Sequence, residues 1–488
     1  MNSFKKLAGE TAIYGMSSII GRFINYWLVP YYSFIFVTAE YGVVTNLYAY
    51  TALLLVILTY GMETGFFRYA SQNDDKEKVF SSTIISLFVT SLAFLLLVLT
   101  FSQSIASWMS YPDHPEYIQW FAIIIAFDAF TSIPFAKLRI ESKAIKFATL
   151  KFINIFITIF LNIFFLSICP ALIKSNPESW VNAIYSPEIG VGYVFISNLI
   201  ASVLNFILLI PEMRIKWQFD GRLLKEMLWY SFPILIVGIG GTITQTSDKI
   251  LFPKLLPIDQ NPMSQLGIYG ANVKLAVILN MFIQAFRYAF EPFFFSQVKS
   301  DDNKRGYAII MKYFVIFGLL IFLGICLYID VVKQIVDKEY HSGLNVVPII
   351  LMANLFLGIY YTLSLWYKLT DKTRYGAYFA SVGALLSLVL NVIFIPKYGY
   401  MASAYAVLIC FIIMTALSYY FGQKHYPINY PLKRIGLYFL AALVIYFVSK
   451  LLNLPPSALM YFIHTVFIVL FLGMVYLLEK KELVKFIK

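Results

Sequence analysis

The chain consists of long apolar stretches joined by short polar connections, and this pattern restricts the fold more than any other feature. About 20 predominantly apolar residues are enough for a helix to cross a bilayer, and runs of this length recur throughout the sequence. Of the 488 residues, 60% are hydrophobic and only 13% are charged, well below the charged fraction of soluble domains. The sequence therefore predicts an all-α polytopic membrane protein.

About fourteen transmembrane helices are expected. Lysine and arginine residues gather in alternate connections, and the richer side holds about four times as many as the other. The positive-inside rule then places both termini in the cytoplasm, and it explains the net charge of +12 without a nucleic-acid partner. The expected spans are 11–35, 42–64, 82–105, 118–136, 147–169, 190–211, 227–247, 267–290, 307–329, 344–366, 375–395, 401–421, 434–452 and 458–478.

The first span, Thr11 to Phe36, carries an arginine near its middle. Arg22 lies on a polar face with Asn25 and with residues spaced four apart. Because an arginine at mid-membrane costs roughly 2.5–3.5 kcal/mol on insertion scales, it should face a bundle interior or a wet cavity. We expect Arg22 to line a cavity that receives an anion; a structural pair with a carboxylate from another helix is the alternative.

Short sequence matches recur in the same order and at nearly constant spacing, which indicates an internal repeat. Glu40-Tyr41-Gly42-Val43 resembles Gln265-Leu266-Gly267-Ile268, and Glu63-Thr64-Gly65-Phe66-Phe67 resembles Glu291-Pro292-Phe293-Phe294-Phe295. The repeat predicts two six-helix lobes related by a pseudo-twofold axis along the membrane normal, followed by two extra helices. The expected domains are residues 1–215, 216–425 and 426–488.

The segments TAIYGMSSIIGRFINYWLVPYY, AEYGVVTNLYAY and GMETGFFRYA resemble bacterial polysaccharide-unit flippases of the Wzx type. These proteins belong to the multidrug/oligosaccharidyl-lipid/polysaccharide exporter superfamily, with the lipid II flippases and the multidrug extruders of the MATE type. The resemblance covers essentially the whole chain. It implies a MATE-like fold in the bacterial cytoplasmic membrane, and a cavity position for Arg22 similar to that of a first-helix arginine in lipid II flippases.

The resemblance also implies a function and a set of partners. The cargo would be an undecaprenyl-diphosphate-linked oligosaccharide, such as an O-antigen, capsule or exopolysaccharide repeat unit, moved between leaflets by alternating access. The implied partners are this anionic polyprenyl-diphosphate-linked oligosaccharide, membrane lipids, a polysaccharide polymerase and a ligase, with a proton or sodium ion as the coupling ion. The last two helices, about 434–478, would hold the lipid tail.

Two further cations lie in the eighth predicted span. Lys274 and Arg287 would add to Arg22 in a cavity that holds a diphosphate, because phosphate oxygens accept charge-assisted hydrogen bonds. Arg287 and Glu291 are four residues apart and can instead form a structural pair. Lys274 and Arg287 lie nearly opposite on a straight helix, so both can face one narrow cavity only if the helix bends.

Three carboxylates are candidates for ion coupling or gating. Asp128, inside an otherwise apolar span, is the better candidate for a relay, with pairing to a lysine or arginine as the alternative. Glu63 and Glu291 occupy equivalent positions of the repeat near helix ends, where a structural tie or a gate is the simpler role.

Other classes of function fit the sequence less well. A lipid II or drug exporter of the same superfamily is the main alternative, although three embedded cations disfavour a drug cavity. A membrane glycosyltransferase or polysaccharide polymerase would need a substantial external loop. The predicted external loops are all short, so no enzyme activity is expected. The three cysteines and four histidines show no ligand spacing, so neither a metal nor a cofactor is expected.

Overall fold

The computed structural model describes Gly15, Ser17, Ile20, Gly21, Lys216 and residues 23–214, 218–296, 302–370 and 372–487, without the side chains of residues 288–303 and 481–487. Within these residues the secondary structure consists of helices, and no strand is present. Twelve of the described helices are long and apolar enough to cross a membrane, and a thirteenth span results if the bent pair α12 and α13 counts as one. The predicted all-α polytopic membrane fold is confirmed, whereas the first of the fourteen expected spans begins outside the described residues.

The chain divides into two compact units, Met1–Gly267 and Ile268–Lys488. This division falls beyond the sixth of the described candidate spans, which ends at Leu255. The domains predicted from the repeat, with divisions after residues 215 and 425, stay a prediction. The helices of the first unit are α2 (Leu28–Ile35), α3 (Thr38–Thr59), α4 (Met62–Gln72), α5 (Lys76–Thr100), α6 (Ser102–Trp108), α7 (Pro115–Ile140), α8 (Ala144–Ile163), α9 (Cys169–Ser175), α10 (Gly192–Leu209), α11 (Gly221–Leu255) and the start of α12 (Pro262–Leu275).

Capping residues set several helix boundaries of the first unit. Tyr60 and Gly61 both have positive φ, and this left-handed break separates α3 from α4. Asp75 accepts a hydrogen bond from the Lys78 amide at the start of α5, and Asp220 accepts hydrogen bonds from the first amides of α11. The core of the unit forms where α4, α5, α7 and α11 meet, around the fully buried side chains of Met62, Phe66, Leu87, Ile133 and Met227.

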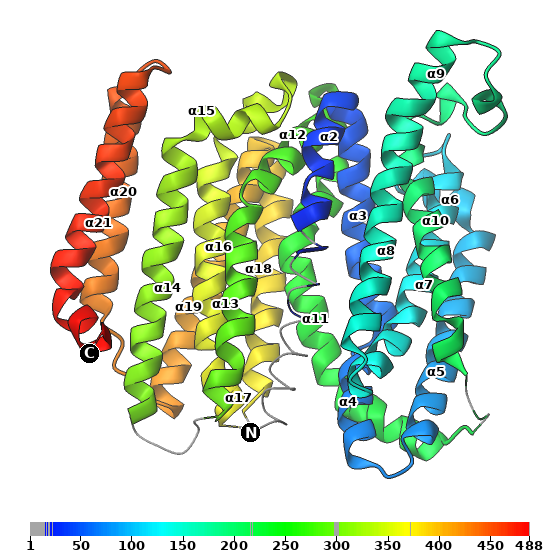
Figure 1. Cartoon of the computed structure of the whole chain (residues 1–488), viewed down its shortest axis with the longest axis horizontal. Coiled ribbons are helices and arrows are strands. Elements are labelled where there is room, and N and C mark those ends of the chain that lie inside the picture. The colour runs from blue at the N-terminus through cyan, green and yellow to red at the C-terminus, as the bar shows by residue number, and fades with distance from the viewer. Residues whose placement is uncertain are drawn as a thin grey trace. The chain divides into compact units, whose positions relative to one another are not determined.

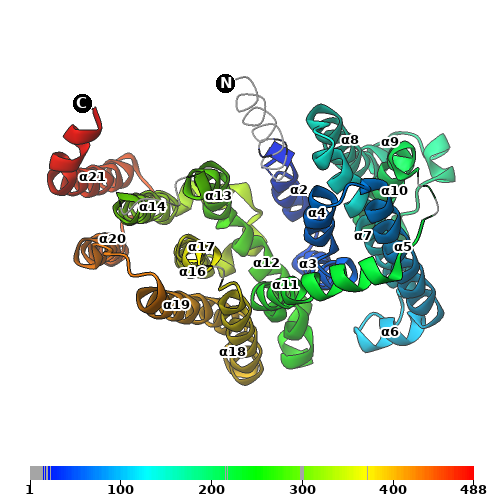
Figure 2. The ribbon, with the colours of Figure 1, turned by 90° about the horizontal axis from the view of Figure 1, so that it is seen from below.

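The second unit comprises the remaining helices, many of which run side by side (Figure 1). α16 and α18 both pack against α19, and α14 packs against α16 and α20. Figure 2 shows α20 and α21 next to each other beside α14. The helices are α13 (Val277–Ser296), α14 (Asp302–Leu327), α15 (Ile329–Val332), α16 (Val346–Leu363), α17 (Leu365–Leu369), α18 (Arg374–Tyr398), α19 (Tyr400–His425), α20 (Leu432–Leu452) and α21 (Ala458–Ile487).

Two of the predicted spans are not straight helices. The first predicted span is interrupted by a turn at Trp27, and α2 then continues to Ile35. α12 and α13 are bent by 44° at Ala276, between Lys274 and Arg287. The eighth span therefore has the bend that both cations would need in order to approach one cavity.

Candidate functional site

The predicted anion site of the first span is only partly described. Arg22 lies outside the described residues, whereas Asn25 is described and exposed. Just after Asn25, hydroxyl groups fix α2 against α8 and the π-helical turn that follows it. The Tyr32 hydroxyl donates to Asn162 Oδ1 at 2.8 Å, and the Tyr31 hydroxyl lies 2.7 Å from Ser167 Oγ. The segment that carries Asn25 thus leads into a helix held by specific side-chain contacts.

The two cations of the eighth span have different surroundings within the second unit. Lys274 is exposed in the last turn of α12. Arg287 is half-buried in α13, with its guanidinium 4.4 Å from the ring centroid of Tyr361 on α16. Such a cation–π contact holds the planar group in a fixed orientation. The side chain of Glu291 lies outside the described residues, so the proposed pair with Arg287 stays a prediction.

Asp128 lies in a polar cluster inside the first unit. Ser202 Oγ on α10 donates to Asp128 Oδ1 at 2.9 Å, and Lys151 on α8 is near enough to interact electrostatically with the carboxylate. One turn along α10, Asn198 Nδ2 donates to the Tyr48 hydroxyl of α3 at 3.2 Å. Helices α3, α7, α8 and α10 therefore each contribute a polar side chain to this region.

Two further polar side chains of α10 have unsatisfied atoms. Ser197 Oγ and Asn205 Oδ1 are buried, and neither has a hydrogen-bond partner within the described part of the chain. Buried polar groups without a protein partner generally bind water or an ion. α10 therefore has two buried polar atoms, besides its contact with Asp128, that can bind water or an ion.

Glu63 has a different environment. Its Oε1 accepts a hydrogen bond from Arg139 Nη1 at 2.9 Å, which joins the start of α4 to the end of α7. Both side chains are more than 40% exposed. The arginine also stacks on Phe67, with its guanidinium carbon 4.6 Å from the ring centroid. Of the two roles expected for Glu63, the geometry fits the structural tie.

The second unit contains a buried ion network that the sequence did not predict. Glu479 on α21 is fully buried and pairs with Lys312 of α14, which is only 1% exposed. The Tyr438 hydroxyl donates to Glu479 Oε1 at 2.5 Å, and Arg434 Nη1 donates to the same oxygen at 3.2 Å. This network ties α20 and α21 to α14. It was missed because Lys312 and Arg434 were placed with the basic connections that set orientation.

Backbones come unusually close where α3 meets the start of α12 in the first unit. A Cβ atom on Gly42 would lie 1.9 Å from the Met263 carbonyl oxygen, and one on Gly267 would lie 1.8 Å from the Thr38 carbonyl oxygen. In both cases the clashing carbonyl lies four residues before the partner glycine. The contact is therefore reciprocal, and only glycine fits at either position. Beside it, the hydroxyl oxygens of Thr38 and Ser264 are 2.6 Å apart.

Comparison with solved structures shows the same fold in membrane transporters. Lipid II flippase MurJ in an inward closed conformation matches with a TM-score of 0.74 and 17% identity, covering 96% of this chain and 99% of that chain. A MATE multidrug resistance transporter matches in its inward-facing conformation with a TM-score of 0.63 and in its outward-facing conformation with 0.57, in both cases with 11% identity, covering 85% of this chain and 94% of that one. No curated protein is significantly similar in sequence.

The sequence itself matches a protein family. The family model described as "Polysaccharide biosynthesis protein" aligns with residues 35–337, which is more than half of the chain. The aligned residues include Asp128, Lys274 and Arg287 and extend from α2 to the segment after α15. The chain belongs to the polysaccharide biosynthesis protein family, and it has the fold of the MurJ and MATE transporters.

Proposed function

We propose that the protein is a flippase that moves undecaprenyl-diphosphate-linked oligosaccharides across the bacterial cytoplasmic membrane. The observation that carries the proposal is the coincidence of a polysaccharide biosynthesis family with the fold of a lipid-linked sugar flippase. In this proposal the protein works between the enzymes that assemble a repeat unit and the polymerase and ligase that use it. Both termini lie in the cytoplasm, in agreement with the distribution of basic residues.

The diphosphate of the cargo binds to cations along the transport path in this proposal. Arg22, Asn25, Lys274 and Arg287 form its contacts, because guanidinium and ammonium groups donate charge-assisted hydrogen bonds to phosphate oxygens. The orientation of Arg287 by Tyr361 supports its part in this set, since a fixed guanidinium loses little entropy on binding an anion.

The coupling site is the cluster around Asp128. Protonation or sodium binding at this carboxylate would change its hydrogen bond with Ser202 and its attraction to Lys151, and would thereby affect the packing of α7 against α10. Glu63 and Glu291 act near the helix ends as ties or gates. Asn205 lies three residues after Ser202 on α10, and its unsatisfied oxygen Oδ1 supports the coupling site because it offers a place for water or an ion.

Alternating access requires contacts that close and part. We assign this role to the glycine contact of α3 with α12, which the positive-inside rule places at the external side. The reciprocal approach of Gly42 and Gly267 is what a pseudo-twofold axis near this point would produce, and it supports the two predicted lobes. The two helix starts would separate when the protein opens to the outside.

Depletion of the protein followed by analysis of lipid-linked sugars tests this function. The expected result is that one undecaprenyl-linked oligosaccharide accumulates in the inner leaflet, and its composition identifies the cargo. Unchanged amounts and unchanged sidedness of all lipid-linked sugars would contradict the proposal.

Lipid II is the second candidate cargo, because the matched flippase of the same fold carries lipid II in its name. Accumulation of lipid II with a normal level of other lipid-linked sugars on depletion would establish this alternative. A drug extruder is disfavoured by the cations at the proposed site.

A further inference from the structure

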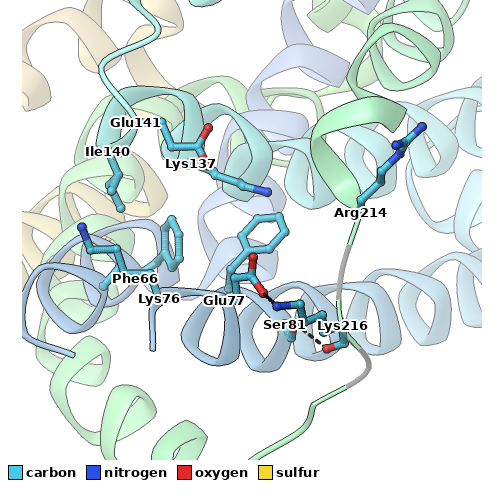
Figure 3. A pocket seen from close by; sticks show the side chains of 11 residues that line it. Phe66, Lys76, Glu77, Ser81, Lys137, Ile140, Glu141, Arg214 and Lys216 are labelled. Atoms are coloured by element: carbon cyan, nitrogen blue, oxygen red, sulfur yellow. Dashed lines mark hydrogen bonds and ion pairs between the residues drawn. The ribbon is translucent and has the colours of Figure 1, made fainter. Parts of the chain in front are cut away.

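A cavity of about 300 Å³ lies inside the first unit, among the side chains of α4, α5, α7 and the connection from α10 to α11 (Figure 3). We call it the basic pocket. It lies at the lysine-rich end of the helices, which the positive-inside rule places on the cytoplasmic side. Its lining residues are Phe66, Ala70, Lys76, Glu77, Phe80, Ser81, Lys137, Ile140, Glu141, Arg214 and Lys216.

The charges that line the pocket leave an excess of cations. Glu77 Oε2 pairs with Lys216 Nζ at 2.7 Å, and Glu141 pairs with Lys143, which lies outside the lining, at 2.7 Å. The other three cations, Lys76, Lys137 and Arg214, make no ion pair within the part of the chain that the structure describes. In the view of Figure 3 Lys137 lies between Lys76 and Arg214. An anion in this pocket would meet little repulsion from Glu77 and Glu141, because each is already paired with a lysine.

The wall that carries Arg214 and Lys216 is held in place by α5. Ser81 Oγ donates to the Lys216 carbonyl oxygen at 3.0 Å, and the Asp220 amide donates to Ser82 Oγ at 3.0 Å. An ion pair of 2.7 Å between Lys78 and Asp220 adds to these contacts. Lys216 and Asp220 are thus held against α5 before any ligand binds, which reduces the entropy that binding would lose.

The position of Lys137 is also fixed. Its amino group donates to the Glu212 carbonyl oxygen at 3.2 Å and lies 4.2 Å from the ring centroid of Phe80. A lysine ammonium has three hydrogens, so one contact with a carbonyl leaves others for a ligand. Phe66 and Phe80, both nearly fully buried, supply apolar surface next to the cations.

We propose that the basic pocket binds the phosphate of an anionic glycerophospholipid from the leaflet at this end of the protein. The cations suit the phosphodiester of such a lipid. The apolar surface suits the part of the lipid next to its phosphate, and the ends of α5 and α7 are where a headgroup at the membrane interface would lie. None of the residues proposed to bind the cargo lines the pocket, and the proposal does not depend on the identity of the cargo. Because one wall of the pocket is the connection to α11, a bound headgroup would strengthen the attachment of that helix to α5 and α7.

Native mass spectrometry of the purified full-length protein tests the proposal. The protein is titrated in neutral detergent with phosphatidylglycerol or with phosphatidylcholine, and the double variant Lys76→Gln with Lys137→Gln is compared with the unchanged chain. The expected result is preferential binding of phosphatidylglycerol and a loss of affinity of about 25-fold in the variant, because each of the two basic residues near the membrane surface contributes a factor of about five. A millimolar concentration of inorganic phosphate or pyrophosphate is expected to leave lipid binding unchanged.

The matched control is Lys174→Gln with Lys397→Gln, which removes the same charge from exposed lysines at other sites. Equal loss in the pocket variant and the control would overturn the proposal in favour of general electrostatic attraction. Equal binding of the two lipids, or displacement by inorganic phosphate, would also overturn it, the latter in favour of a soluble anion. Since Lys137 has structural contacts, Lys76→Gln with Arg214→Gln is a second variant: its loss of affinity supports the proposal, and its normal affinity contradicts it.

Discussion

Asp128 and Glu63 are carboxylates of the same unit in opposite surroundings. Asp128 accepts a hydrogen bond from Ser202 inside a polar cluster, whereas Glu63 is exposed and bound by Arg139. A carboxylate that works as a relay must change its protonation or ion binding during the cycle. A carboxylate that joins the ends of two helices through an arginine needs no such change. On this difference we propose that Asp128 takes part in coupling and that Glu63 attaches α4 to α7.

Asp128→Asn is predicted to uncouple transport from its driving ion, because the amide keeps the size of the carboxyl group but neither titrates nor carries charge. Translocation in proteoliposomes under an imposed proton or sodium gradient should fall by about tenfold, the range of a typical coupling factor. The control is Glu63→Gln, which loses an exposed ion pair and should keep its dependence on the gradient. A normal response of Asp128→Asn to both gradients would rule out its role as a relay.

Asp220 shows how a single residue fixes the start of a helix. Its hydrogen bond with Lys78, together with those from the Leu223 and Arg222 amides, lowers the pKa of the carboxyl group to about 2. A carboxyl group whose pKa is lowered on folding stabilises the folded state at pH values above its ordinary pKa of 3.8. This contribution is lost as the pH falls toward 2. At neutral pH the cap is therefore fully ionised and in place.

Asp220→Ala is predicted to loosen the first turn of α11 at neutral pH, since the cap and the ion pair are both lost. Amide hydrogen exchange in the peptide that covers this turn should become about fivefold faster. Asp220→Asn can still cap the helix and should show a smaller effect. The exposed loop variant Asp113→Ala serves as the control, and exchange in Asp220→Ala as slow as in that control would contradict the role of the cap.

At the scale of elements, the attachment of the last two helices rests on one carboxylate. Glu479 is shared by Lys312, Arg434 and Tyr438, so its removal leaves a buried lysine without its counter-charge. Glu479→Gln is predicted to destabilise the protein by about 3 kcal/mol, as a broken buried pair does. Thermal unfolding in detergent measures this, and Lys312→Met with Glu479→Met should recover part of the loss. A single variant as stable as the unchanged chain would show that the network does not hold these helices.

The contact between α3 and α12 gives a second prediction at this scale. Thr38→Cys with Ser264→Cys should form a disulfide, because the two hydroxyl oxygens are 2.6 Å apart and the backbones nearly touch. If these helix ends part during each cycle, oxidation should stop translocation and a reducing agent should restore it. Each single-cysteine variant is the control. Full transport by the oxidised double variant would show that the contact does not have to open.

Several elements could be predicted from the sequence because their cause is local. Apolar runs of sufficient length define the spans. The proline at the first position of α7 and the aspartates just before α5 and α11 mark helix starts. The bend at Ala276 has no glycine or proline to signal it. The sequence indicated only that Lys274 and Arg287, on opposite faces of a straight helix, would need a bend in order to face one cavity. The partners of Glu479 could not be found from one sequence, because they lie 41 to 167 residues away in the chain.

At the scale of the whole molecule, the family and the fold support one account. A chain from a polysaccharide biosynthesis family has the fold of transporters that open to either side of a membrane. The sequence predicted the fold class through its apolar runs and its repeat. For the candidate site it provided the residues but not their surroundings, since the contacts of Asp128 and Arg287 come from helices distant in the chain.

The central claim is tested most directly by translocation of a defined cargo in proteoliposomes. Undecaprenyl-diphosphate-linked oligosaccharide is placed in both leaflets, and a membrane-impermeant glycosidase reports the fraction that is accessible from outside. The account predicts that inner-leaflet cargo becomes accessible with the protein, and much more slowly with Arg22→Ala than with Arg22→Lys. Accessibility that stays at the level of protein-free vesicles, while lipid II in parallel vesicles is moved, would contradict the account.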